Sequence, residues 1–145
     1  MAIIRKVRLY TDGGSRGNPG AGAIGVVICD ESNKILHEYA ECIGHCTNNQ
    51  AEYKALIKGL DLCAKYTRGE VICFCDSDLL IKQMNGDYRI KNDQLRELFH
   101  EVNRNKGVFT TVTFQHVNRT NQRIQRADKL LNDAHNGNSM DRAIP

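Results

Sequence analysis

The chain lacks a long apolar run, a large net charge and a standard nucleotide-binding motif. Without an apolar run of membrane-spanning length, and with residues 1–7 too short and too charged for a secretory signal, a cytoplasmic protein with no membrane partner is expected. The formal net charge of +3 is compatible with a polyanionic partner but falls far short of the basicity of a dedicated nucleic-acid-binding module. The glycine-rich stretch 13–22 has neither the Gly-Lys-Ser/Thr ending of a P-loop nor the spacing of a dinucleotide fingerprint, which excludes nucleotide binding of those kinds.

The size and composition predict one soluble domain. The chain has 145 residues, of which 41% are hydrophobic and 26% charged, and this balance is typical of a globular domain with a sizeable core. We expect the domain to span residues 1–137, the tail 138–145 to be flexible, and the protein to be a monomer, because no exposed apolar stripe is evident.

Six cysteines raise the questions of disulfides and of zinc. Cysteines in apolar, strand-like or helical runs usually act as small buried hydrophobes, and this description fits the cysteines at 29, 63, 73 and 75. The segment Cys42–Cys46, which includes His45, offers half of a zinc site without a convincing second half. Reduced thiols are therefore the prediction.

The first part of the chain predicts an antiparallel meander. The extended run 7–11 leads directly to Asp12, and the apolar run 23–29 and the run 35–43 are typical of two further strands. Between the first two strands, the stretch 13–22 has almost no side-chain bulk, so its backbone N–H groups can approach a ligand closely. A wide hairpin connection would explain the same glycines, but the sequence places an acid beside open space.

Three further acids follow at the ends of predicted elements. Glu52 lies in the first turn of a predicted helix, 47–66, on the same stripe as its apolar residues, so the carboxylate faces inward. Asp76 directly follows the apolar strand 71–75, which is where α/β sheets place ligands. Asp128 lies near the start of a helix predicted from about 124 to 134. Helix capping is the structural alternative for Glu52 and Asp76.

Four carboxylates gathered at one place repel one another, and a fold that collects them generally does so around hard cations. The natural occupant is Mg²⁺, with Mn²⁺ as a substitute. Two such ions would activate a water and stabilise the leaving oxygen at a phosphodiester. No serine, cysteine or histidine nucleophile is then required.

The order and surroundings of these acids resemble type 1 ribonuclease H over the range from Val7 to about His135. The matching motifs are Tyr-Thr-Asp-Gly-Gly-Ser-Arg-Gly-Asn-Pro-Gly at 10–20, Thr-Asn-Asn-Gln-Ala-Glu-Tyr at 47–53, Cys-Asp-Ser-Asp at 75–78 and Arg-Ala-Asp-Lys-Leu at 126–130. The resemblance implies an α/β fold with a five-stranded mixed sheet, an antiparallel meander followed by two parallel strands, flanked by helices. It also implies endonucleolytic hydrolysis of the RNA strand of RNA/DNA hybrids, leaving 5′-phosphate and 3′-hydroxyl ends.

The resemblance further implies the roles of individual residues. The metal-binding, catalytic acids are then Asp12, Glu52, Asp76 and Asp128. Substrate contacts fall on the backbone of Gly13 and Gly14 and on the side chains of Asn18, Thr47, Asn48 and Asn49. Amides suit the recognition of 2′-hydroxyls and minor-groove base edges, and Thr47 and Asn18 suit a phosphate of the DNA strand. Asparagine and threonine also cap helices and form turns.

The chain departs from the resembled family at three points. Where many members carry a histidine in the loop before the last acid, this loop reads Asn-Arg-Thr-Asn-Gln-Arg at 118–123. His116 is interpreted as a core or surface residue, and Arg119 can offer charge to a phosphate but cannot act as a base. Asp78 replaces a small amide and either helps to hold metal or caps a helix. The tryptophan-bearing basic protrusion and a separate hybrid-binding module are expected to be absent, and members of this kind sometimes also cut double-stranded RNA.

Two other classes of function are also compatible with the sequence. One is a nuclease-like domain that binds nucleic acid without cutting it, although the four acids argue against this. The other is a different enzyme on the same fold, such as a resolvase, exonuclease or integrase-type transferase. The Thr-Asn-Asn and Gly-Asn-Pro-Gly motifs favour a site that reads RNA.

Overall fold

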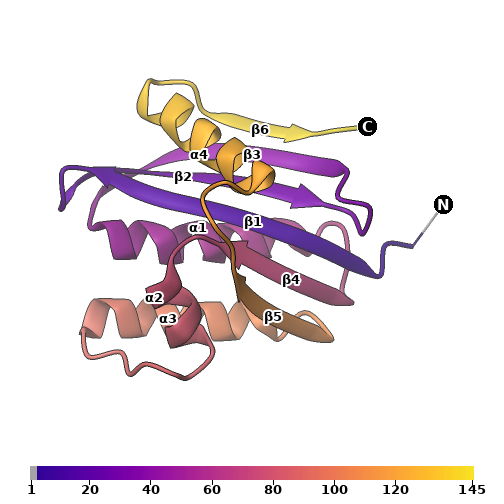
Figure 1. Ribbon diagram of the computed structural model, residues 1–145, viewed down its shortest axis with the longest axis horizontal. Helices are drawn as coiled ribbons and strands as arrows, with labels where there is room; N and C mark the ends of the chain where they lie inside the picture. Colours follow the sequence, from indigo (N-terminus) through magenta and orange to yellow (C-terminus); the bar gives the residue numbers. More distant parts are fainter. Residues whose placement is uncertain (1–2) are drawn as a thin grey trace.

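A computed structural model describes residues 3–145 and shows one mixed sheet with helices on both faces (Figure 1). Residues 1 and 2, the beginning of the segment considered as a possible signal, lie outside the described residues. The elements, in chain order, are β1 (Lys6–Arg16), β2 (Gly20–Cys29), β3 (Ile35–Cys46), α1 (Asn48–Cys63), β4 (Glu70–Cys75), α2 (Asp78–Met84), α3 (Asp93–Lys106), β5 (Thr111–His116), α4 (Gln122–His135) and β6 (Met140–Ala143).

The strand order β5-β4-β1-β2-β3-β6 places the parallel pairs beside the meander. Strands β1, β2 and β3 pair in antiparallel fashion, and β4 and β5 extend the sheet in parallel from β1, as the resemblance implied. Tyr10 of β1 is the register partner of Phe74 of β4. Two residues further along, both strands reach an acid, so the register itself brings Asp12 and Asp76 together.

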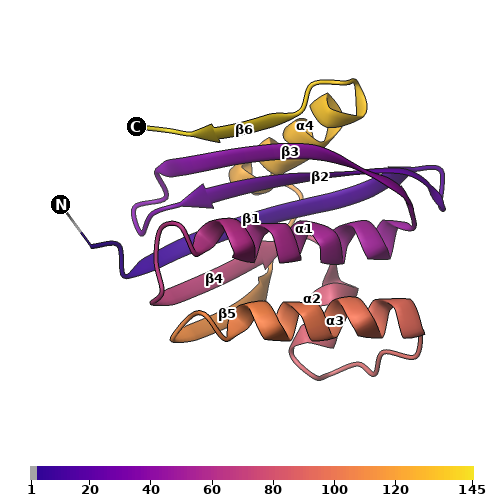
Figure 2. The same cartoon turned by 180° about the vertical axis from the view of Figure 1, so that it is seen from behind.

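Helices cover both faces of the sheet because its strands alternate their side chains between two cores. Leu9 of β1 belongs to the core shared with α1 and α3, and its neighbour Tyr10 belongs to the core shared with α4. Figure 2 shows α1 and α3 together on one face, with α4 on the opposite face. Side chains two residues apart on a strand point to the same face of the sheet, so Asp12 points to the same side as Tyr10, towards α4.

The glycine-rich stretch forms a longer hairpin than the sequence predicted. The first strand was expected to end near Thr11, but β1 continues to Arg16 and β2 already begins at Gly20. Close packing explains the glycines inside the strand, because a Cβ on Gly13 would lie 2.2 Å from the carbonyl oxygen of Ala51 in α1. Only Gly17 supplies a left-handed turn conformation here, with φ of 82°.

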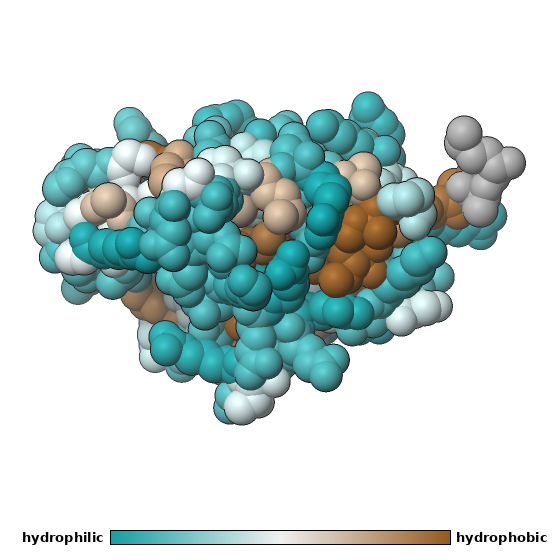
Figure 3. Space-filling model, turned by 90° about the horizontal axis from the view of Figure 1, so that it is seen from above, coloured by the Kyte–Doolittle hydropathy of each residue, from teal (hydrophilic) through white to brown (hydrophobic). Residues whose placement is uncertain are grey.

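The sheet has six strands rather than the expected five, because the tail expected to be flexible forms β6. This strand pairs with β3 in antiparallel fashion, and its polar side chains anchor it on both faces of the sheet. Asp141 Oδ1 lies 2.6 Å from Nε2 of the buried His37, and Arg142 donates a hydrogen bond of 2.6 Å to the buried Glu38. Around α4 and β6 the surface is largely hydrophilic, and the most extended apolar area of this face lies towards the N-terminal end (Figure 3).

Replacing Glu38 by glutamine is expected to lower the free energy of unfolding by about 2 kcal/mol, as for a lost charge-assisted hydrogen bond. The carboxylate of Glu38 accepts hydrogen bonds from Arg126 and Arg142, and the contact with Arg126 lowers its pKa. Urea denaturation measures the effect, and Glu31→Gln in the exposed β2–β3 turn is the matched control. Equal stabilities of the two variants would contradict an anchoring role for this contact.

All six cysteines are free thiols, as predicted. Those at 29, 63, 73 and 75 are buried, and burial raises the pKa of each of these thiols. Within residues 3–145, the potential metal ligands that lie together in a group of three are the carboxylates of Asp12, Glu52 and Asp76. The segment Cys42–Cys46, considered as half of a zinc site, belongs to no such group among the described residues. Among the helices of residues 3–145, none has the length and apolar character needed to cross a membrane.

Candidate active site

Four acids line one open cleft bounded by β1, the start of α1, the end of β4 and α4. Asp12 lies within β1, Glu52 in the first turns of α1, Asp76 directly after β4, and Asp128 in α4. Each of the first three offers a carboxylate oxygen, and these three oxygens lie within 4.8 Å of one another. The cleft is lined by Asp12, Gly13, Gly14, Asn48, Asn49, Glu52, Asp76, Arg119, Ile124, Gln125, Asp128 and Leu131.

Glu52 is held in the site rather than used as a helix cap. Thr47 is the N-cap of α1, and its side chain accepts a hydrogen bond from the backbone N–H of Gln50, whose side chain bonds back to Thr47. This capping box satisfies the helix start without Glu52. Oε1 of Glu52 instead accepts a hydrogen bond of 2.7 Å from the backbone N–H of Gly13, which aims the carboxylate into the cleft.

The carboxylates of Asp12 and Glu52 have strongly raised pKa values. The pKa of Asp12 rises to about 9, first because of burial and then because Glu52, Asp76 and Asp128 place negative charge beside it. Burial raises the pKa of Glu52 to about 8, against the opposing effect of the hydrogen bond from Gly13. The protein alone therefore does not compensate the charge of this cluster, which is the property expected of a site for a hard cation.

Arg119 extends from the loop before α4 to the acid cluster. Its Nε lies 3.0 Å from Oδ2 of Asp76, although the Arg119 side chain is 89% exposed. Its charge also acts to lower the pKa of Glu52. By contrast, His116 is exposed at the end of β5 and does not line the cleft, in agreement with its interpretation as a surface residue.

Asp78 neither caps α2 nor belongs to the group of three clustered acids. The side chain of Ser77 caps α2 by accepting a hydrogen bond from the backbone N–H of Leu80. Asp78 forms an ion pair of 2.9 Å with Lys82, one turn further along the helix. Its carboxylate is therefore engaged on α2.

Two of the predicted substrate contacts lie beside the cleft rather than in its lining. Asn18 accepts a hydrogen bond of 3.0 Å from the backbone N–H of Asn48, and Thr47 caps α1 next to it. Asn48 is fixed from a second side, because the backbone N–H of Ser15 donates to its Oδ1 at 2.9 Å. The amide group of Asn48 therefore keeps its Nδ2 donors available.

Two polar residues on α4 that were not predicted from the sequence belong to this region. Gln125 lines the cleft three residues before Asp128, and Asn132 donates a hydrogen bond to the Asp128 carbonyl four residues later. Residues three and four apart share one helix face. The helical spacing around Asp128 could therefore have identified both.

Gly13→Ala is expected to destabilise the protein and to displace Glu52. The added Cβ would lie 2.2 Å from the Ala51 carbonyl oxygen and 2.7 Å from the backbone nitrogen of Glu52, so α1 has to move. Overpacking of this kind costs about 1–3 kcal/mol. Gly14→Ala, where the nearest atom lies at 3.8 Å, is the control, and equal thermal unfolding of both variants would contradict the close packing.

Comparisons with known proteins agree with this geometry. A family model described as "Reverse transcriptase-like" matches residues 10–134. The crystal structure of RNase H1 from Halobacterium salinarum superposes with a TM-score of 0.87 at 35% identity, covering 92% of this chain and 99% of that one. The chain belongs to the ribonuclease H family.

Two further ribonuclease H relatives add to this picture. LC11-RNase H1, isolated from compost, is 42% identical, with a TM-score of 0.83 over 90% of this chain and 97% of that chain, and that structure is a complex with an RNA/DNA hybrid. A bifunctional protein of Mycobacterium tuberculosis is 38% identical over 130 residues, which are 89% of this chain and 35% of that protein. The chain thus spans about a third of the length of this mycobacterial relative.

Proposed function

We propose that the protein is a metal-dependent endoribonuclease that hydrolyses the RNA strand of RNA/DNA hybrids and leaves 5′-phosphate and 3′-hydroxyl ends. The observation that carries this proposal is the cluster of Asp12, Glu52 and Asp76, whose carboxyl groups lie together in an open cleft that also has amides in its lining. The binding of a hybrid by the related LC11-RNase H1 supports the choice of substrate.

The donor set fits divalent magnesium. Carboxylate oxygens are the ligands that Mg²⁺ prefers, and three of them within 4.8 Å match a small, hard cation. Asp12, Glu52, Asp76 and Asp128 would hold two Mg²⁺ ions, with Mn²⁺ as a substitute. When bound, such ions lower the pKa of an attacking water and neutralise the charge that develops at the phosphodiester.

The remaining residues of the cleft bind and orient the substrate. Asn48, fixed by Ser15, presents its Nδ2 donors to acceptors in the minor groove, and Asn49 lies beside it. The backbone of Gly13 and Gly14 allows the RNA strand to come close to the acids. Recognition of the 2′-hydroxyl distinguishes RNA from DNA at such a surface.

Charged and polar groups around the cleft hold phosphates. Arg119 binds a phosphate of the RNA strand next to the acids, because its exposed guanidinium already lies beside Asp76. Asn18 and Thr47 lie together at the start of α1, where helix geometry favours anions, and they hold a phosphate of the DNA strand.

Cleavage of a 5′-labelled RNA tests the proposal when the RNA is offered paired with DNA, paired with RNA and unpaired. The expected result is cutting of the hybrid in Mg²⁺ or Mn²⁺ and none in EDTA. A ligase should rejoin the product ends without further treatment, because ligation needs a 5′-phosphate and a 3′-hydroxyl. Cutting of the RNA duplex would extend the function to double-stranded RNA. Binding of the hybrid without cutting in either metal would contradict the enzyme assignment.

A further inference from the structure

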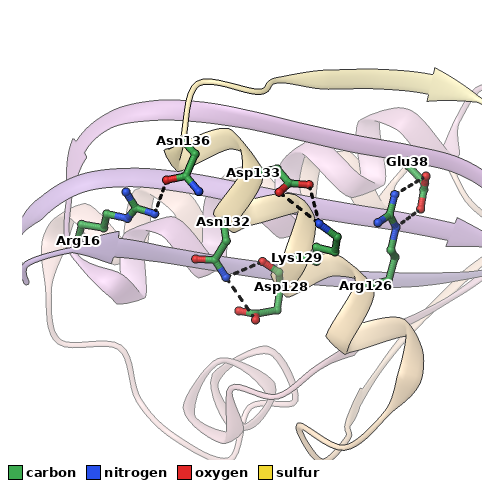
Figure 4. Close-up of polar contacts among 8 residues, drawn as sticks. All are labelled: Arg16, Glu38, Arg126, Asp128, Lys129, Asn132, Asp133 and Asn136. Carbon is green, nitrogen blue, oxygen red and sulfur yellow. Dashed lines mark hydrogen bonds and ion pairs between the residues drawn. The ribbon is translucent and has the colours of Figure 1, made fainter.

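Asp128 differs from the other three acids because it is exposed and has lysine and arginine neighbours on its own helix. Both of these neighbours are engaged by other carboxylates (Figure 4). Nζ of Lys129 lies 3.4 Å from each carboxylate oxygen of Asp133, and Arg126 donates hydrogen bonds to Glu38. The cations nearest to Asp128 in sequence are thus directed away from it.

The contact that α4 does offer to Asp128 is neutral. Nδ2 of Asn132 donates to the main-chain carbonyl oxygen of Asp128 at 3.0 Å and to its carboxylate Oδ2 at 3.4 Å. Figure 4 shows the amide of Asn132 reaching back along the helix to both oxygens. One side chain therefore restrains the Asp128 carboxylate without cancelling its charge.

A basic residue four positions after an aspartate behaves differently in this same protein. On α2, Lys82 lies four residues after Asp78, and the two form an ion pair of 2.9 Å. A lysine at position 132 would have the same helical spacing to Asp128 and would neutralise it. An amide at this position holds the carboxylate and leaves its charge free for a cation.

We propose that Asn132 is a positioning residue for the cation site, acting through Asp128. It holds the Asp128 carboxylate ready on the rim of the cleft, so that this carboxylate is pre-oriented when a divalent cation binds. The inference rests on the proposed function, since it assigns Asp128 to the cation site. Hydrogen-bond partners of metal ligands typically change metal affinity about 10–100-fold when removed, and the exposure of this pair points to the lower end of that range.

Calorimetric titration of the substrate-free protein with Mn²⁺ measures the metal affinity and tests the proposal directly. A second measurement is the Mg²⁺ concentration that gives half-maximal cleavage of the hybrid. Asn132→Ala is expected to weaken metal binding about tenfold, with kcat restored by excess metal. Asn132→Lys is expected to weaken it further by pairing with Asp128. Asn132→Gln, which retains a donor able to reach one turn back, is expected to bind metal nearly as well as the original protein.

Asn103→Ala provides the matched control, because Asn103 is an exposed asparagine on α3, which lies on the opposite face of the sheet from α4. Its metal affinity is expected to be unchanged. Unaltered Mn²⁺ affinity in both Asn132→Ala and Asn132→Lys would overturn the proposal, as would a loss of kcat that excess metal does not restore. Calorimetry separates the role of Asn132 from the proposed function. A protein that binds Mn²⁺ through Asp128 but cuts no hybrid would refute the proposed function and leave the role of Asn132 intact.

Discussion

Replacing Asp12 by asparagine is expected to lower cleavage of an RNA/DNA hybrid by at least about a thousandfold, the scale of losing a central electrostatic group in an active site. Asp12 is the acid whose pKa responds to all three of the others, so it lies at the electrostatic centre of the cluster. Asparagine keeps the shape of the side chain but removes the charge that holds a cation. Single-turnover cleavage at saturating Mg²⁺ measures the loss.

Binding of the hybrid should survive the same substitution. The substrate contacts proposed for Asn48, Asn49 and Arg119 are left in place, and removing a negative charge reduces repulsion of the phosphates. Fluorescence anisotropy in Ca²⁺ measures the affinity. Asp61→Asn, an exposed acid on α1, is the control and should cut normally. Residual cleavage by Asp12→Asn within a factor of about ten of the original rate would show that the cluster does not carry the chemistry.

The metal-free protein is expected to lose stability as the pH rises from about 4 to about 9. The pKa of Asp12 rises from 3.8 to about 9 and that of Glu52 from 4.5 to about 8 on folding. Because the folded state binds these protons more tightly than the unfolded state, the stabilisation is complete below the unfolded pKa values and is lost as the pH passes through the folded ones. The free energy of unfolding is therefore expected to fall across this pH range.

Asp12→Asn should therefore be more stable than the original protein in EDTA at pH 8, and the difference should shrink towards pH 4. Mg²⁺ should raise the unfolding temperature of the original protein, because it binds only the folded state, and should raise that of the variant much less. Differential scanning calorimetry at pH 4, 6 and 8 measures both effects. A variant that is less stable than the original protein at pH 8 without metal would contradict the raised pKa values.

The acids could be predicted from the sequence because local spacing determines where each one lies. Asp76 follows a continuous apolar strand, and Glu52 lies on the same face of its helix as the apolar residue Leu56. These local patterns alone indicate the direction in which each acid points. The register of two parallel strands then brings Asp76 beside Asp12. Short-range patterns therefore indicated the positions of Glu52 and Asp76, whereas the pairing of β1 with β4 determines that Asp76 lies beside Asp12.

The last strand could not be predicted in this way. The segment Met140–Ala143 is polar and short, without the β-branched or aromatic residues that indicate a strand. It becomes one because His37 and Glu38 of β3, more than a hundred residues earlier, hold Asp141 and Arg142. Contacts across such a distance in the chain leave no local pattern.

The roles of the glycines were also only partly predictable. The sequence indicated open space beside Asp12, and the cleft is there, lined by Gly13 and Gly14. It did not indicate that Gly13 packs against the carbonyl oxygen of Ala51 within a continuous strand. The same lack of side-chain bulk serves a ligand on one face of β1 and a helix on the other.

One competition experiment distinguishes a ribonuclease that acts on RNA/DNA hybrids from a DNA nuclease and from a domain that only binds. Equal amounts of an RNA/DNA hybrid, an RNA duplex and a DNA duplex of the same sequence, each strand with its own fluorophore, are incubated in one tube with the protein and Mg²⁺. The predicted result is that the RNA strand of the hybrid is cut first, while its DNA strand and the DNA duplex remain intact. Cutting of the DNA duplex, or a hybrid that is bound but left whole, would contradict the account.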